Sequence, residues 1–118
     1  MNKKAIIISI KSFKLSNKEI KILSTQRPWG LILFKRNIKS LNQIKNLIKK
    51  IRKITKDSKF PIMIDEEGKT VTRLTKIIDH NVSQKLFGDF YRFNPKTSVK
   101  VYKNYINYLC DLLRSIGI

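Results

Sequence analysis

Three short apolar runs set the strongest limit on how this chain can fold. They occupy residues 5–10, 31–34 and 61–65, and they are rich in Ile and Leu. Continuous apolar runs of this length are typical of strands that are covered on both faces in a parallel sheet. The sequence therefore predicts three buried strands, the first of them at residues 5–10.

Helix signals follow the first two runs. Ser16 with Glu19, and Ser40 with Gln43, both have the spacing of a capping box at a helix start. After Ser40, apolar residues recur every three or four positions from residue 41 to residue 54. This spacing predicts a strongly amphipathic helix.

The C-terminal part of the chain divides into two stretches. Residues 66–97 have no sustained apolar period, which predicts mainly loop with short helical pieces. Asn94 and Pro95 resemble an N-cap followed by Pro at the first helical position, so they predict a last helix that Gly117 would end. Tyr102 and Tyr105 fall on the apolar face expected of that helix.

The alternation of strands and helices predicts right-handed parallel crossovers and an α/β fold. A length of 118 residues favours a single domain, residues 1–118. Three strands make a poor closed unit, since a complete eight-fold barrel takes about 250 residues. The chain therefore reads as part of a larger α/β unit.

The formal charge of +18 raises the alternative of a small basic module that binds nucleic acid through the helix carrying residues 45–56. The Lys residues are spread along the whole chain, which favours a solvated surface over a binding stripe. We therefore expect no nucleic-acid partner.

Cysteine usage and hydropathy indicate the compartment. Cys110 is the only cysteine and lies among leucines, which predicts a reduced thiol in the core. The N-terminal apolar run is shorter than the roughly 7–15 residues of a signal peptide, so we expect a cytoplasmic protein without a membrane partner. Metal-ligand spacing and phosphate-binding loops are absent from the sequence, and we expect no cofactor.

The residues that end the third apolar run are candidates for a binding site. In a parallel sheet the crevice lies at the carboxyl ends of the strands, where Asp65 is expected. Its carboxylate could accept hydrogen bonds from hydroxyl groups, and Arg73 could return over the same site as a donor. Gly68 between them permits a tight turn. A salt bridge that only fastens a loop explains the same pair equally well.

Two motifs resemble those of a known enzyme family. Residues 29–37, WGLILFKRN, are similar to the segment G-G-[IV]-I-L-F-x-R-N of bacterial β-N-acetylglucosaminidases of glycoside hydrolase family 3. Residues 65–73, DEEGKTVTR, resemble that family's signature D-Q-E-G-G-R-V-x-R. The resemblance implies the N-terminal portion of a (β/α)8 TIM-type barrel, with about three parallel β/α units and the barrel incomplete in this chain.

The same resemblance implies a function and roles for residues. Asp65 and Arg73 match the family's contacts to the sugar in the −1 subsite, and Glu67 and Gly68 match its E-G pair. The implied reaction is hydrolysis of terminal N-acetyl-β-glucosaminides with retention, in cytoplasmic recycling of cell-wall amino sugars. Lys69 and Thr70 depart from the family's second Gly and first Arg.

The family's catalytic residues have no match in this sequence. Its acid/base His and nucleophilic Asp belong to segments expected beyond Ile118, and His80 lies outside the family's K-H-F-P-G-H-G context. We therefore predict no catalytic residue in this chain, and His80 is interpreted as a surface or loop residue. A further hypothesis is a non-catalytic relic that folds with a partner supplying the missing barrel portion.

Overall fold

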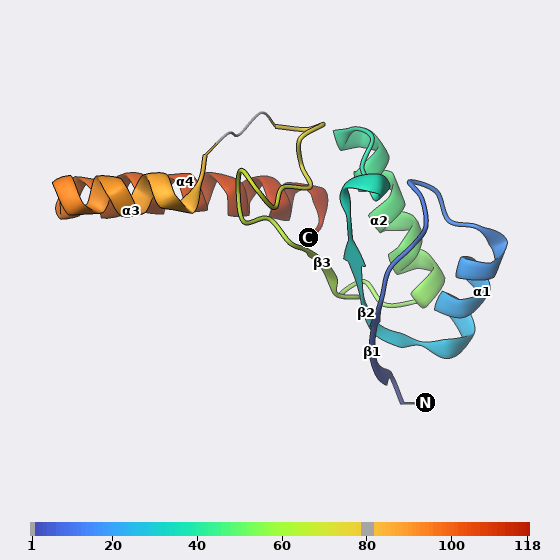
Figure 1. Ribbon diagram of the computed structural model, residues 1–118. Coiled ribbons are helices and arrows are strands. Elements are labelled where there is room, and N and C mark those ends of the chain that lie inside the picture. Colours follow the sequence, from blue (N-terminus) through green and yellow to red (C-terminus); the bar gives the residue numbers. More distant parts are fainter. Residues whose placement is uncertain (1, 79–81) are drawn as a thin grey trace.

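The computed structural model describes residues 2–78 and 82–118. Its elements alternate as the sequence predicts, and Figure 1 shows their arrangement. The strands are β1 (Lys4–Ile8), β2 (Pro28–Leu33) and β3 (Ile62–Ile64), and the α-helices are α1 (Asn17–Gln26), α2 (Leu41–Thr55), α3 (Gln84–Phe93) and α4 (Pro95–Ile116). A 3-10 turn at Lys35–Asn37 follows β2.

The three strands form a parallel sheet in the order β1-β2-β3. Helix α1 connects β1 to β2, and α2 connects β2 to β3, as expected for β/α units. This confirms a mixed α/β fold with parallel strands.

The predicted helix starts are present. Ser16 and Glu19 form a complete capping box at α1, and the Ser40 hydroxyl accepts a hydrogen bond from the backbone N–H of Gln43 at α2. The side chain of Gln43 bonds the N–H of Lys39 instead of Ser40, so the second box is only half formed. Asn94 caps α4, and Gly117 ends it with a φ of 98°.

The core lies between the sheet and helix α2. The apolar face of α2 buries Ile44, Leu47, Ile48 and Ile51 against Leu31 and Leu33 of β2 and other buried residues. Leu109 and Ile116 bring the C-terminal part of α4 into the same core. Burial of α2 side chains is therefore what holds the first and second β/α units together.

The first strand differs from its prediction. It ends at Ile8, and the side chains of Ile6 and Ile7 are 51% and 47% exposed, so the expected cover on both faces is wrong. The reason is its position, because β1 is an outer strand that pairs with β2 alone within the described sheet. Periodicity reports the apolar character of a strand but not its place in the sheet order.

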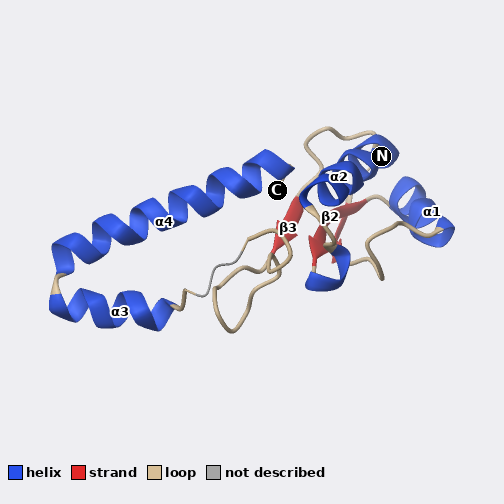
Figure 2. Ribbon diagram, turned by 90° about the horizontal axis from the view of Figure 1, so that it is seen from above, coloured by secondary structure: helices blue, strands red, loops and turns tan. Residues whose placement is uncertain are grey.

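In the stretch 66–97 the described residues form loop followed by short helical segments, as predicted. The stretch contains the ten-residue helix α3, whose start is capped by Ser83. Helices α3 and α4 form a hairpin that extends away from the sheet in both views (Figures 1 and 2). The molecule is accordingly elongated, with extents of 53 × 28 × 21 Å.

Aromatic contacts fix the hairpin. The Phe87 ring of α3 packs against Tyr102 and Tyr105 of α4, with ring centroids 4.7 Å and 5.4 Å apart. The buried Ser98 hydroxyl donates a hydrogen bond to the carbonyl oxygen of Phe87. Both tyrosines are thus half-buried on the predicted apolar face, whereas Phe93 at the hairpin tip is 94% exposed.

We expect Ile51→Ala to lower the free energy of unfolding by about 3 kcal/mol, because Ile51 is fully buried in α2 and its removal leaves a cavity. Ile6→Ala is the matched control on β1. It should cost about 1 kcal/mol or less, since the side chain is already half exposed. Urea unfolding followed by circular dichroism measures both, and equal losses would contradict the assignment of β1 as an exposed outer strand.

Candidate functional site

The carboxyl ends of β1 and β2 are joined by the side chains that follow β2. Asn37 is fully buried, and its amide donates hydrogen bonds to the carbonyl oxygens of Ile10 (3.0 Å) and Ser12 (2.9 Å). Its side-chain oxygen accepts a bond of 2.8 Å from the N–H of Phe34. Asn37 therefore ties the chain leaving β1 to the chain leaving β2, which satisfies buried backbone groups that no strand partner reaches.

Arg36 strengthens the same junction. Its guanidinium donates to the carbonyl oxygen of Ile10 at 3.1 Å and to the Ser9 hydroxyl at 3.2 Å. It also lies over the Phe34 ring, with the guanidinium carbon 4.5 Å from the ring centroid. Sequence reasoning assigned no role to Arg36 or Asn37 individually. The available signal was an Asn placed three residues after a buried strand.

The structure brings the two predicted sugar contacts together. Asp65 directly follows β3, and Arg73 returns to it so that a guanidinium nitrogen lies 3.9 Å from a carboxylate oxygen. The Asp65 side chain is half exposed and the Arg73 side chain about one quarter exposed. An exposed pair of this kind contributes little to stability. Its polar atoms remain accessible to a ligand at this edge of the sheet.

Both guanidinium groups of this edge lie close to the Phe34 ring. The Arg73 guanidinium carbon is 5.7 Å from the Phe34 ring centroid, on the ring that also contacts Arg36. Nε of Arg73 is buried and has no hydrogen-bond partner among the residues described. Arg73 therefore has two neighbours at this edge, the Phe34 ring and the Asp65 carboxylate.

The loop between Asp65 and Arg73 is closed by backbone contacts. The N–H groups of Glu67 and Gly68 both donate to the carbonyl oxygen of Val71, at 2.8 Å and 3.2 Å. The carbonyl oxygen of Glu67 accepts from the Gln84 side chain, while the Glu67 side chain itself is exposed. Glu67 thus supports the loop through its main chain.

Gly68 is required by the geometry of the loop. Its φ is 110°, and a Cβ atom there would lie 2.4 Å from the carbonyl oxygen of Val82. Both facts exclude a larger residue without movement of the backbone. The role predicted for Gly68, a tight turn, agrees with its conformation.

Lys69 and Thr70, two of the departures from the family signature, are exposed at the tip of the loop. They line a pocket of about 240 Å³ together with the start of α3, from Ser83 to Lys85. Asp65 and Arg73 lie outside that lining. The two departures therefore face a different part of the surface from the Asp65–Arg73 pair.

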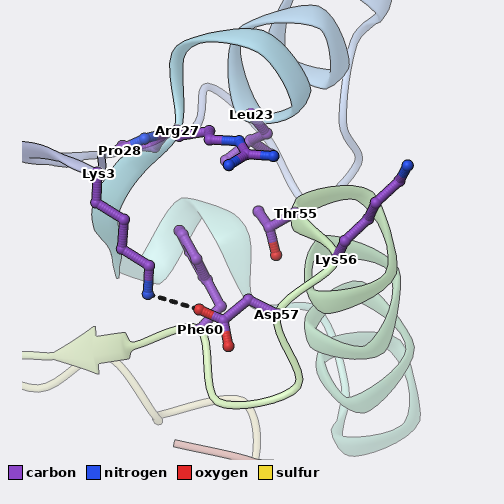
Figure 3. A pocket seen from close by; sticks show the side chains of 8 residues that line it. All are labelled: Lys3, Leu23, Arg27, Pro28, Thr55, Lys56, Asp57 and Phe60. Atoms are coloured by element: carbon purple, nitrogen blue, oxygen red, sulfur yellow. Dashed lines mark hydrogen bonds and ion pairs between the residues drawn. The ribbon is translucent and has the colours of Figure 1, made fainter. Parts of the chain in front are cut away.

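A second pocket, of about 260 Å³, lies beside the first residues of β1 and β2 (Figure 3). Lys3 donates to a carboxylate oxygen of Asp57 across it, at 2.7 Å, and this bond lowers the pKa of Asp57. Arg27 and Lys56, which follow α1 and α2 and both have positive φ, are among its lining residues. It lies at the amino ends of the strands, opposite Asp65, and its cations compensate the helix C-termini.

The remaining predictions have mixed outcomes. Arg52 of the basic α2 face donates to the carbonyl oxygen of Gly117 at 2.8 Å, so this face is partly used within the molecule. Cys110 is half-buried on α4.

His80 lies outside the described residues. Within residues 2–78 and 82–118, no cluster of His, Cys, Asp and Glu side chains is arranged to hold a metal ion, and no described helix is long and apolar enough to cross a membrane.

Comparison with known proteins gives several matches. A β-hexosaminidase of Haemophilus ducreyi is 42% identical over 84 residues, which are 70% of this chain and 24% of that protein. A β-hexosaminidase of Haemophilus influenzae is 36% identical over 58% of this chain and 19% of its own length. The chain therefore spans about a quarter or less of these relatives. No family model matches the chain.

Solved structures give the same relationship. NagZ of Neisseria gonorrhoeae, crystallised with N-trifluoroacetyl-D-glucosamine, has a TM-score of 0.56 and 29% identity over 65% of this chain and 22% of its own. A family 3 β-N-acetylglucosaminidase of a Paenibacillus species has a TM-score of 0.53 and 27% identity over 58% of this chain and 14% of its own.

We expect Gly68→Ala to lower the free energy of unfolding by at least about 2 kcal/mol, because of its positive φ and the close approach of Val82. Gly88→Ala in α3 is the matched control. A Cβ there meets no atom within 4 Å, so the helix should gain about 0.5–1 kcal/mol. Urea unfolding distinguishes the two, and a neutral Gly68→Ala would mean that the loop adopts another conformation.

The names of these relatives confirm the resemblance to an O-glycosyl hydrolase that the two motifs predicted. In sequence and in fold, the chain resembles the N-terminal part of the bacterial β-N-acetylglucosaminidases of glycoside hydrolase family 3.

Proposed function

We propose that the chain is part of a family 3 β-N-acetylhexosaminidase and that Asp65 and Arg73 form part of its −1 subsite. The observation that carries the proposal is their meeting at the carboxyl end of β3, 3.9 Å apart. It is supported by the family relationship, in which one relative was crystallised with a derivative of glucosamine. The substrate class is a terminal N-acetyl-β-glucosaminide.

The chemistry of the pair suits a neutral sugar. The Asp65 carboxylate accepts hydrogen bonds from hydroxyl groups, and the Arg73 guanidinium donates to hydroxyl or amide oxygens. Because Asp65 neutralises Arg73, the site has no strong preference for an anionic ligand. The guanidinium donors lie in one plane by resonance, and contact with the Phe34 ring restricts the orientation of that plane, which favours ordered contacts with sugar hydroxyls.

The proposed reaction is a double displacement with retention. A nucleophile attacks the anomeric carbon while an acid protonates the leaving oxygen, and water then releases the sugar. The family resemblance implies a His and an Asp for these steps, from segments other than those matched here. In this scheme Asp65 and Arg73 bind and orient the sugar and do not break the bond.

We further propose that additional β/α units complete a TIM-type barrel around this sheet. The outer strand β1 has half-exposed Ile6 and Ile7, and the hairpin exposes Leu86, Tyr91 and Phe93. Apolar surface of this extent is typical of a face that another part of a fold covers. A partner polypeptide carrying the missing barrel portion would supply that cover. Cytoplasmic recycling of cell-wall amino sugars is the setting that the family resemblance implies.

Titration with N-acetyl-D-glucosamine, followed by NMR, tests the subsite. Asp65→Ala and Arg73→Ala should each weaken binding roughly 10- to 100-fold, since each removes charged hydrogen-bond partners of the sugar. Asp89→Ala, an exposed carboxylate on α3, is the matched control and should bind as the unaltered chain does. If Asp65→Ala lowers the thermal unfolding temperature and leaves the affinity unchanged, the pair only fastens the loop.

Activity provides a second test. We expect the 118-residue chain alone to release no chromophore from a chromogenic N-acetyl-β-glucosaminide, because it contributes binding residues and no acid/base or nucleophile. The assay compares the chain with a β-hexosaminidase of the family as a positive control. Turnover that Asp65→Ala abolishes would contradict the proposed division of roles.

A further inference from the structure

Glu66 turns its carboxylate back into its own loop, unlike its neighbour Asp65. One carboxylate oxygen accepts hydrogen bonds from the backbone N–H groups of Arg73, at 2.7 Å, and Leu74, at 3.1 Å. Bonds from N–H groups to an ionised carboxylate are stronger than bonds between neutral groups. Two consecutive backbone groups of the returning chain are therefore fixed by a single side chain.

These bonds fix the position of the Arg73 backbone, from which its side chain extends. Leu74, the next residue, is fully buried, so the chain is anchored in the core on one side of Arg73. Glu66 is adjacent to Asp65 in sequence and holds Arg73 from the other side of the loop. The separation between Asp65 and the Arg73 backbone is thus set through Glu66.

Glu66 also lies near the hairpin. Burial raises the pKa of the Tyr105 phenol, and the nearby Glu66 carboxylate adds to this effect. Tyr105 belongs to α4 and packs against Phe87 of α3. The Glu66 carboxylate is therefore near enough to the helical hairpin to act on Tyr105, while its hydrogen bonds lie within its own loop.

We propose that Glu66 is the positioning residue of the site: it holds Arg73 against the Phe34 ring and opposite Asp65, and so sets the geometry of the sugar contact. This inference rests on the proposed −1 subsite. It assigns Glu66 no contact with the sugar. Its effect on the ligand passes through Arg73.

The test uses Glu66→Ala, Glu66→Gln and the control Asp111→Ala, which removes the same charge from an exposed site on α4. Glu66→Ala should speed amide hydrogen exchange at Arg73 and Leu74 roughly tenfold and weaken N-acetyl-D-glucosamine binding roughly tenfold. Glu66→Gln keeps an acceptor and should fall between Glu66→Ala and the unaltered chain. Asp111→Ala should behave as the unaltered chain in both measurements.

The NMR shifts of the Arg73 side chain give a readout that a loss of stability alone would not move. The Phe34 ring displaces these shifts, and Phe34→Leu provides the value without the ring. In Glu66→Ala the shifts should move toward that value. Unchanged Arg73 shifts and unchanged exchange at Arg73 and Leu74 would overturn the positioning role.

The two proposals fail in different ways. If the unaltered chain does not bind N-acetyl-D-glucosamine, the subsite is rejected, while the exchange rates and Arg73 shifts still decide the role of Glu66. If Glu66→Ala does not fold, Glu66→Gln decides alone. Exchange at both amides as slow as in the unaltered chain would then overturn the role.

Discussion

The buried amide of Asn37 is the interaction on which the carboxyl edge of the sheet depends. Parallel strands end with backbone groups that have no hydrogen-bond partner on the neighbouring strand. Two such strand ends must be held together before side chains beyond them can be positioned. Asn37 supplies two donors and one acceptor at this point, all of them used. An unsatisfied buried group costs about 1–3 kcal/mol, so loss of the amide at this position should destabilise the junction.

From this junction the site follows in steps along the chain. Phe34 is held by Asn37, and its ring provides the surface on which Arg73 lies. Arg73 is aligned from its backbone by Glu66. The half-exposed Asp65 faces the Arg73 guanidinium, whereas Glu67 acts through its main chain. The adjacent acidic residues Asp65, Glu66 and Glu67 thus make three different kinds of contact.

Much of the fold could be predicted from the sequence because its signals are local. Capping residues such as Ser16 and Asn94, and the period of three and four in α2, depend on neighbours within one helical turn. The exposure of Ile6 and Ile7 could not be predicted, since it depends on the order of the strands in the sheet, and local sequence patterns do not reveal that order. A short helical piece was predicted in the stretch 66–97, but the bounds of α3 were not, because its cap, Ser83, lacks a Glu or Gln three residues later. For the candidate site, Asp65 and Arg73 were predicted through a motif, whereas the hydrogen bonds of the Asn37 and Glu66 side chains to backbone groups elsewhere in the chain have no pattern in the sequence.

The α3–α4 hairpin has a consequence for the order of folding. Its two helices are neighbours in sequence and meet at Asn94 and Pro95, so closing it costs little loop entropy. The parallel pairs β1–β2 and β2–β3 each require a whole helix to be formed and turned back before any strand contact is made. The hairpin can therefore assemble on its own timescale, ahead of the sheet. Its aromatic contacts are then already in place when the loop carrying Arg73 closes over the strand ends.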